Sequence, residues 1–261
     1  MRIVRTLDNL DLERESVLTI GTFDGVHLGH QYVLTRLVSR ARLSGRTSIA
    51  LTFHPHPRAI LDRVPVTYLS TPEERAELMA PLGVEVLVVM PFTLELAHTP
   101  ARDFVRLLYD RLRMRELWVG ADFAMGKNRE GNAQRLQEWG AAMGYTCRTV
   151  EPLLIDGQPV SSTRIRDLLS GGQVEAANRL LGRPYKVSGP VVHGAQRGRS
   201  LGFRTANLRL PAERALPANG VYAVRVALGR GVYGGVANVG TRPSFGGNDR
   251  LLEVHLFHFE G

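Results

Sequence analysis

The chain has 261 residues, of which 44% are hydrophobic, and it carries a formal net charge of +8 at pH 7. This length suffices for two hydrophobic cores, and no apolar run approaches the ~20 residues needed to span a bilayer. The single cysteine, Cys147, excludes an intrachain disulfide framework and a CxxC metal site and favours a reducing compartment. We therefore expect a soluble, cytoplasmic protein.

The positive charge favours phosphate-bearing ligands. The arginines form no long run and are spread through helical stretches, so solvated helix faces account for most of them. No helix-turn-helix, zinc or aromatic-basic RNA motif accompanies the charge. Small phosphorylated molecules are therefore favoured as ligands, and nucleic acid is not expected as a partner.

Short apolar runs alternate with helical periodicity through the first half of the chain. Thr71, Pro72 and Glu74 form a capping-box pattern, and Thr99 with Pro100 marks a similar helix start. Strands are expected at residues 16–20, 48–53, 84–89, 117–119 and 147–150, and helices at residues 31–43, from 72, at 104–112 and at 136–143. This alternation predicts an α/β domain of the Rossmann-like class with a parallel, doubly wound sheet.

The pattern changes near Arg183, where helical periodicity ends. Thirteen of the 27 glycines lie in residues 183–261. Short β-like runs separated by turn residues are expected at residues 186–192, 221–228, 232–239 and 252–259. This pattern predicts a small β-barrel, so we expect two domains, residues 1–183 and residues 184–261.

A motif rich in glycine and histidine, Gly-Thr-Phe-Asp-Gly-Val-His-Leu-Gly-His, occupies residues 21–30 between the first strand and the first helix. Open α/β sheets bind ligands at such a position. Gly25 and Gly29 let the backbone approach a phosphate, and the helix that begins near His30 directs N–H groups toward it. His27 and His30 supply side-chain donors. The alternative is that both histidines only decorate a turn.

A second motif, Ser-Ser-Thr-Arg-Ile-Arg, occupies residues 161–166 before a helical stretch at residues 167–170. Serine and threonine are common N-caps, which is one interpretation. Arg164 and Arg166 beside a helix N-terminus also form a clamp for a triphosphate, which is the other. Both interpretations can hold together.

These motifs together resemble the HxGH nucleotidyltransferase superfamily, and more narrowly the prokaryotic bifunctional riboflavin kinase/FMN adenylyltransferases, or FAD synthetases. The resemblance runs from Ile20 almost to the C-terminus and implies that ATP adenylylates FMN to give FAD and pyrophosphate. The residues implied for this site are catalytic His27, His30 and Arg166, ATP-binding Gly21, Thr22, Phe23, Asp24, Gly29, Ser162 and Thr163, and flavin-binding Phe53, Pro55, His56, Asp122 and Phe123.

Two positions near the implied flavin site depart from the family. Met125 stands where an aromatic residue is usual, and Ala124 stands where a larger residue is common. His54 and His56 can equally be loop histidines, stiffened by the prolines that follow them.

The chemistry of this transfer agrees with the residue types. The phosphate of FMN has a second pKa of about 6, so it is mostly dianionic at neutral pH and attacks the α-phosphorus of ATP without a general base. Catalysis then depends on positioning and on stabilising negative charge, which the histidines, a helix N-terminus, Arg166 and Mg²⁺ can share.

In the second half, residues 193–207 read His-Gly-Ala-Gln-Arg-Gly-Arg-Ser-Leu-Gly-Phe-Arg-Thr-Ala-Asn. By itself this string is typical of a hairpin turn. It also resembles the flavokinase signature, and Arg204 stands where that family has proline. The resemblance implies a kinase site that binds ATP through Gly194, Gly198, Arg199, Gly202 and Phe203 and Mg²⁺ through Thr205 and Asn207.

Glu253 is the candidate general base of the kinase. Riboflavin attacks through an alcohol, which must lose a proton during attack on the γ-phosphorus. The alternative is a solvent-facing glutamate on an alternating strand. His258 stands where the family commonly has aspartate.

Two functions follow from these motifs. The first is a bifunctional enzyme that makes FMN and then FAD, with ATP, riboflavin and FMN as substrates. The second is a monofunctional FMN adenylyltransferase whose C-terminal barrel binds flavin or a partner surface. In the family the segment equivalent to residues 253–259 continues into a further strand and a terminal helix, so we expect the barrel to be incomplete at its C-terminus. No membrane partner is expected, and oligomerisation is not predicted.

Overall fold

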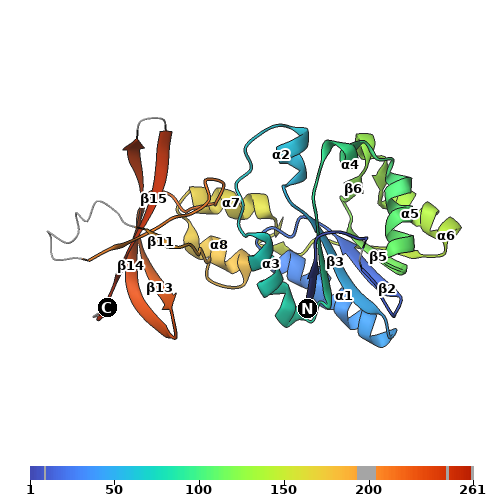
Figure 1. Ribbon diagram of the computed structural model, residues 1–261, viewed down its shortest axis with the longest axis horizontal. Coiled ribbons are helices and arrows are strands. Elements are labelled where there is room, and N and C mark those ends of the chain that lie inside the picture. The colour runs from blue at the N-terminus through green and yellow to red at the C-terminus, as the bar shows by residue number, and fades with distance from the viewer. Residues whose placement is uncertain (9, 193–203, 245–246, 260–261) are drawn as a thin grey trace. The chain divides into compact units, whose positions relative to one another are not determined.

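The computed structural model describes residues 1–8, 10–192, 204–244 and 247–259 (Figure 1). The chain forms two compact units, Met1–Ser162 and Thr163–Gly261. In the part of the chain that the structure describes, no helix combines the length and the apolarity needed to cross a bilayer.

A six-stranded parallel sheet forms the centre of the first unit. Its order from edge to edge is β1 (Arg2–Val4), β4 (Val86–Met90), β3 (Thr47–Phe53), β2 (Ser16–Ile20), β5 (Met114–Gly120) and β8 (Thr146–Val150). The chain passes from β2 through β3 to β4 on one side and continues with β5 and β8 on the other. The order therefore reverses beside β2, and doubly wound sheets bind ligands at the carboxyl end of such a switch point.

Helices cover both faces of this sheet (Figure 1). The helices are α1 (Leu28–Leu43), α2 (Pro57–Leu61), α3 (Pro72–Met79), α4 (Leu94–His98), α5 (Ala101–Arg111) and α6 (Ala133–Met143). Val17 of β2 packs in the apolar layer of α1 and α3, whereas its neighbour Leu18 packs in the layer of α5 and α6. Burial on both faces explains why β4 is a continuous apolar run and why β2 and β3 are buried along almost their whole length.

Small elements connect these layers. They are the 3₁₀ turns η1 (Ala80–Leu82) and η2 (Lys127–Arg129) and the short paired strands β6 (Ala124–Met125) with β7 (Gly131–Asn132) and β9 (Leu154–Ile155) with β10 (Gln158–Pro159).

Capping interactions decide where two of the helices begin. The Thr71 hydroxyl accepts from the Glu74 N–H at 3.2 Å, and the Glu74 carboxylate accepts from the Thr71 N–H at 3.0 Å, so the predicted capping box is confirmed. Helix α1 begins at Leu28, ahead of the predicted residues 31–43, because the His27 side chain caps it. Histidine is an uncommon N-cap, so periodicity alone placed this start too late.

Within residues 163–192, 204–244 and 247–259, the second unit combines two helices with a five-stranded antiparallel sheet. The helices are α7 (Ser162–Ser170) and α8 (Val174–Leu181), and the sheet order is β11 (Val191–Val192), β12 (Ala206–Leu208), β15 (Gly247–Leu256), β14 (Gly231–Ser244) and β13 (Gly220–Leu228). The run predicted at residues 186–192 forms a strand only at its end, because Pro190 has no N–H for pairing. The predicted fold class was an α/β Rossmann-like domain followed by a small β-barrel. It is confirmed as a Rossmann-like domain with a parallel sheet followed by a domain built on an antiparallel sheet.

Candidate active sites

Residues 21–27 form a tight loop between β2 and α1. Phe23, Gly25 and Val26 have positive φ angles of 48°, 76° and 38°. This region is unfavourable for a bulky or β-branched side chain, so surrounding contacts must hold Phe23 and Val26 there. The Val26 N–H donates to the Phe23 carbonyl at 3.1 Å, and the Gly25 N–H donates to the Ser70 hydroxyl at 2.7 Å. Loops constrained in this way are typical of ligand sites.

His27 lies at the N-cap of α1, with 4% of its surface exposed. Its Nδ1 accepts a hydrogen bond from the His30 N–H at 3.3 Å. A ring nitrogen that accepts carries no proton, so the proton of neutral His27 lies on Nε2. His27 thus caps the helix with Nδ1 and carries its N–H at Nε2.

The ring of His30 stacks on that of His27, with a centroid distance of 3.6 Å and an interplanar angle of 18°. Burial, followed by the proximity of His27 and Arg75, holds the pKa of His30 well below its ordinary value of 6.5, so the ring is neutral at pH 7. The His30 Nδ1 is buried and has no hydrogen-bond partner among the described residues. A buried nitrogen of this kind is a candidate to contact a ligand.

Gly29 and Gly21 occupy places without room for a side chain. A Cβ atom on Gly29 would lie 3.1 Å from the His27 ring and 3.2 Å from the Val160 carbonyl oxygen. A Cβ atom on Gly21 would lie 3.1 Å from the Phe23 ring. Both glycines therefore allow aromatic rings to pack against the loop backbone.

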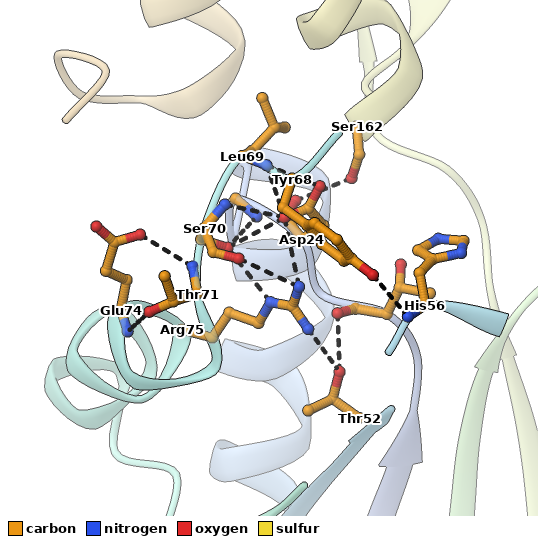
Figure 2. Close-up of polar contacts among 12 residues, drawn as sticks. Asp24, Thr52, His56, Tyr68, Leu69, Ser70, Thr71, Glu74, Arg75 and Ser162 are labelled. Carbon is orange, nitrogen blue, oxygen red and sulfur yellow. Dashed lines mark hydrogen bonds and ion pairs between the residues drawn. The ribbon is translucent and has the colours of Figure 1, made fainter. Parts of the chain in front are cut away.

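The Asp24 side chain is fully buried, and the chain itself binds its carboxylate (Figure 2). This carboxylate accepts from the N–H groups of Leu69 and Ser70, each at 3.0 Å, and pairs with the Arg75 guanidinium at 3.5 Å. In this arrangement the Asp24 side chain holds the loop in place.

Two hydroxyl groups bind carbonyl oxygens of the same loop (Figure 2). The Thr52 hydroxyl donates to the Thr22 carbonyl at 2.8 Å, and the Ser162 hydroxyl donates to the Asp24 carbonyl at 2.9 Å. The loop is therefore anchored by Thr52 of β3 and by Ser162, the last residue of the first unit.

Thr163 and Arg166 lie in the first turns of α7, within the second unit. The half-buried Arg166 donates from its guanidinium to the Thr163 hydroxyl at 3.3 Å. The motif at residues 161–166 thus forms the start of a helix, the feature that both the N-cap and the phosphate-clamp interpretations require.

The first group of predicted flavin-binding residues lies at the end of β3 and in the loop that follows it. Phe53 contacts the ring of Phe92 edge-on, with a centroid distance of 5.4 Å. His56 caps α2, because its Nδ1 accepts from the Arg58 N–H at 3.1 Å. The His56 N–H in turn donates to the Tyr68 hydroxyl at 2.9 Å. His56 is therefore held by the chain in a defined orientation.

The remaining predicted flavin residues differ in exposure. Pro55 and Phe123 are half-buried, whereas Asp122 is exposed. Phe123 and Met125 both pack against the apolar layer of α5 and α6. Methionine at this position thus retains an apolar packing role that an aromatic residue would also fill.

The predicted kinase residues divide into two groups. Five of them lie outside the described residues: Gly194, Gly198, Arg199, Gly202 and Phe203. The structure describes the others, Thr205, Asn207 and Glu253.

Asn207, Glu253 and Asn238 form a row across three strands. Asn207 of β12 pairs with Glu253 of β15, and Glu253 pairs with Asn238 of β14. Directly paired residues of antiparallel strands lie on the same face, so these three side chains are neighbours. Thr205 precedes Asn207 by two positions and shares that face.

A pocket of about 420 Å³ lies on this face. Its lining residues are Thr205, Val221, Val236, Asn238, Glu253, His255 and Phe257. The Nδ1 of His255 lies 2.9 Å from the carbonyl oxygen of Arg204, which fixes the backbone beside Thr205. Apolar walls with a few convergent polar groups are typical of a site for a small molecule.

Two neighbours of these sites, Arg75 and Tyr68, did not stand out in the sequence, whereas a third, Asn238, did. Arg75 lies in a stretch, residues 72–77, that reads as a solvated helix face, and Tyr68 lies in a loop without periodicity. Asn238 carries a usable signal, because it is a polar residue within an alternating apolar strand. Among the described residues, no group of three or more histidine, cysteine or acidic side chains is arranged to hold a metal ion.

Each half of the chain matches a different known family. The FAD synthetase family matches residues 10–164, and the riboflavin kinase family matches residues 181–261. The bifunctional riboflavin kinase/FMN adenylyltransferase of Pseudomonas fluorescens is 39% identical, over 100% of this chain and 85% of that protein. The protein of the same name from Haemophilus influenzae is 37% identical, over 99% of this chain and 85% of that protein.

A solved structure shares the fold over nearly the whole chain. It is described as a macrolide-efflux protein from Streptococcus pneumoniae, has a TM-score of 0.89 at 30% identity, and is matched over 99% of this chain and 85% of its own. The efflux activity in that description is stated for that protein alone. From the two family matches and the named relatives together, the chain belongs to the bifunctional riboflavin kinase/FMN adenylyltransferase family.

Proposed function

We propose that this chain converts riboflavin to FAD in two ATP-dependent reactions at separate sites. Riboflavin is phosphorylated to FMN in the C-terminal domain, and FMN is adenylylated to FAD with release of pyrophosphate in the N-terminal domain. The observation that carries this function is that each unit has its own polar site and its own family match. The riboflavin kinase match over residues 181–261 argues against the monofunctional alternative.

The working boundary between the domains is placed after Arg183, giving residues 1–183 and residues 184–261. The riboflavin kinase match begins at residue 181, which supports a boundary near this point, whereas the FAD synthetase match ends at residue 164 and the compact units divide after Ser162. A cytoplasmic location is part of the proposal. Cys147 is a free, buried thiol whose pKa burial raises to about 11, as suits a cysteine that stays reduced and unreactive.

In the adenylyl site the start of α1 receives the phosphates of ATP. The Nε2–H of His27 and the neutral ring of His30 donate toward the α-phosphate, and the helix N-terminus adds a partial positive charge. A phosphate oxygen of FMN forms the new bond to the α-phosphorus as the bond to pyrophosphate breaks. Ser162, Thr163 and Arg166 are proposed to bind the triphosphate, and Phe53, Pro55, His56, Asp122 and Phe123 to bind the flavin.

Replacing Gly29 by alanine should lower kcat/KM for FAD formation from FMN and ATP by about tenfold. The added methyl group would meet the His27 ring at 3.1 Å and displace it, and small displacements of positioning groups are costly. Riboflavin phosphorylation should not change. Steady-state kinetics of both reactions measure this. Gly45→Ala is the control, because it strains a positive φ but meets no atom within 4 Å; an equal loss in both variants would contradict the prediction.

Replacing Arg166 by alanine should raise KM for MgATP in FAD formation by about tenfold, because a guanidinium facing phosphate contributes charge-assisted hydrogen bonds. Initial rates at varied MgATP measure the effect, with Arg230→Ala at an exposed turn as the control. Unaltered kinetics would mean that residues 161–166 only begin a helix.

In the kinase site Glu253 accepts the proton of the riboflavin alcohol while the alcohol oxygen forms a bond to the γ-phosphorus of ATP. The bond from the γ-phosphorus to the bridging oxygen breaks, and ADP leaves. Thr205 and Asn207 fit Mg²⁺, because both provide neutral oxygen atoms on the face that carries Glu253. When bound there, the metal ion would neutralise charge on the phosphates of ATP.

The test is to incubate the protein with riboflavin, ATP and Mg²⁺ and to separate the flavins by chromatography. FMN should appear first and FAD should follow. FAD formed only from added FMN would favour the monofunctional alternative, and the absence of both products would overturn the proposed function.

A further inference from the structure

The segment of residues 68–75, which includes the first turn of α3, contacts both predicted substrate loops of the first unit (Figure 2). At one end, the Tyr68 hydroxyl accepts from the His56 N–H at 2.9 Å, in the loop proposed to bind flavin. Further along, the N–H groups of Leu69 and Ser70 donate to the Asp24 carboxylate, in the loop proposed to bind ATP.

The Ser70 hydroxyl links this segment to the ATP loop a second time. It accepts from the Gly25 N–H at 2.7 Å and from the Arg75 Nε at 3.3 Å, and it donates to Asp24 at 3.2 Å. Gly25 is one of the positive-φ residues that shape the loop before His27. The hydroxyl therefore holds the backbone on which the catalytic histidine depends.

Arg75 is buried at the centre of this network, with 1% of its side chain exposed. Its guanidinium donates to the Ser70 carbonyl and to the Thr52 hydroxyl, each at 3.3 Å, and it pairs with Asp24 at 3.5 Å. The Thr52 hydroxyl in turn donates to the Thr22 carbonyl at 2.8 Å. One side chain thus reaches the ATP loop by three routes.

Stabilisation of the fold alone would not require a buried Asp24–Arg75 ion pair. Burying two charges costs solvation free energy, and apolar residues of similar volume often stabilise a fold as well as or better than a buried ion pair. The charge of Arg75 also contributes, after burial and His27, to the lowered pKa of His30. The guanidinium therefore acts on both the geometry and the charge state of the adenylyl site.

We propose that segment 68–75 holds the ATP loop and the flavin loop in one fixed arrangement for adenylyl transfer, with Arg75 as its central positioning residue. This inference rests on the proposed function of the first unit. Arg75 touches no substrate in this scheme and acts through Asp24, Ser70 and Thr52.

The same unit contains a matched control at the opposite ends of the strands. Glu116 has 3% of its side chain exposed and binds Arg40, Arg46 and Arg148 at 2.6–3.1 Å. It lies near the amino end of β5, paired with the first residue of β8, whereas the substrate loops follow the carboxyl ends of the strands. Glu116→Gln therefore disrupts a buried ion network without touching the site.

The experiment compares Arg75→Gln, Arg75→Lys and Glu116→Gln in the full chain. Arg75→Gln should lower kcat for FAD formation from FMN and ATP by about 10²-fold, because misplaced catalytic groups carry losses of that size. Arg75→Lys should recover part of this loss, because lysine restores the positive charge but not the planar set of donors of a guanidinium. Glu116→Gln should lower Tm about as much as Arg75→Gln does, but it should leave kcat for FAD formation within about twofold of the wild-type value. Riboflavin phosphorylation should be unchanged in all three.

A milder variant tests the flavin end of the segment without endangering the fold. Tyr68→Phe removes only the hydroxyl that accepts from His56, and it should raise KM for FMN several-fold with little change in KM for MgATP. Equal kcat losses in Arg75→Gln and Glu116→Gln, or an unchanged KM for FMN in Tyr68→Phe, would overturn the inference. A wild-type chain that makes no FAD from FMN would instead overturn the proposed function, and this inference with it.

Discussion

Replacing His30 by alanine should slow FAD formation from FMN and ATP by about 10²- to 10³-fold, the loss typical of removing one preorganised donor at a site of developing negative charge. The ring is neutral and stacked on His27, and its buried Nδ1 has no partner among the described residues. Riboflavin phosphorylation should stay within about twofold, because its residues belong to the other unit. Single-turnover formation of FAD measures the chemical step directly.

The control for this variant is His98→Ala. His98 is an exposed histidine at the end of α4, and its Nδ1 lies 2.6 Å from the Leu94 carbonyl oxygen. It should leave both reactions unchanged. Parallel loss of phosphorylation in a folded His30→Ala protein would contradict the assignment of one reaction to each domain.

Replacing Glu253 by glutamine should reduce riboflavin phosphorylation by about 10²- to 10⁴-fold, the usual contribution of a general base. Glutamine has nearly the same shape, so the row with Asn207 and Asn238 should persist while the proton acceptor is lost. FAD formation from added FMN should be unaffected. Chromatography of the products from riboflavin and from FMN distinguishes the two reactions.

Glu213→Gln provides the control, because Glu213 is an exposed glutamate of the same unit. Phosphorylation that survives in Glu253→Gln would support the alternative of a solvent-facing glutamate. Loss in both variants would point to general destabilisation, which thermal unfolding would reveal.

Much of the fold was predictable because its signals are local. The apolar runs at β2, β3 and β4 and the Thr71 capping box depend on neighbours in the sequence, and the structure contains them. The start of α1 was not predicted correctly, since a histidine cap depends on the φ angles of the preceding loop. Local rules fail where the backbone adopts an unusual conformation.

The sites were predictable to a different extent. His27 and His30 lie three positions apart at a helix start, so the sequence itself brings them together. Asp24 and Arg75 are separated by residues whose path no periodicity specifies, and their ion pair became visible only in three dimensions. The adjacency of Asn207 and Glu253 likewise depends on the register of strands distant in sequence.

Asn207, Glu253 and Asn238 are neighbours only when their strands pair in the observed register, so kinase activity depends on that register. Side chains alternate along β15, so a shift of one residue would turn Glu253 into the apolar cluster that contains Leu252 and Val254. An unpaired carboxylate buried there would cost on the order of several kcal/mol. Chains with the wrong register would therefore be both inactive and unstable. The kinase turnover of a preparation, relative to that of fully native protein, would therefore report the fraction of chains in which β12, β15 and β14 pair in the native register.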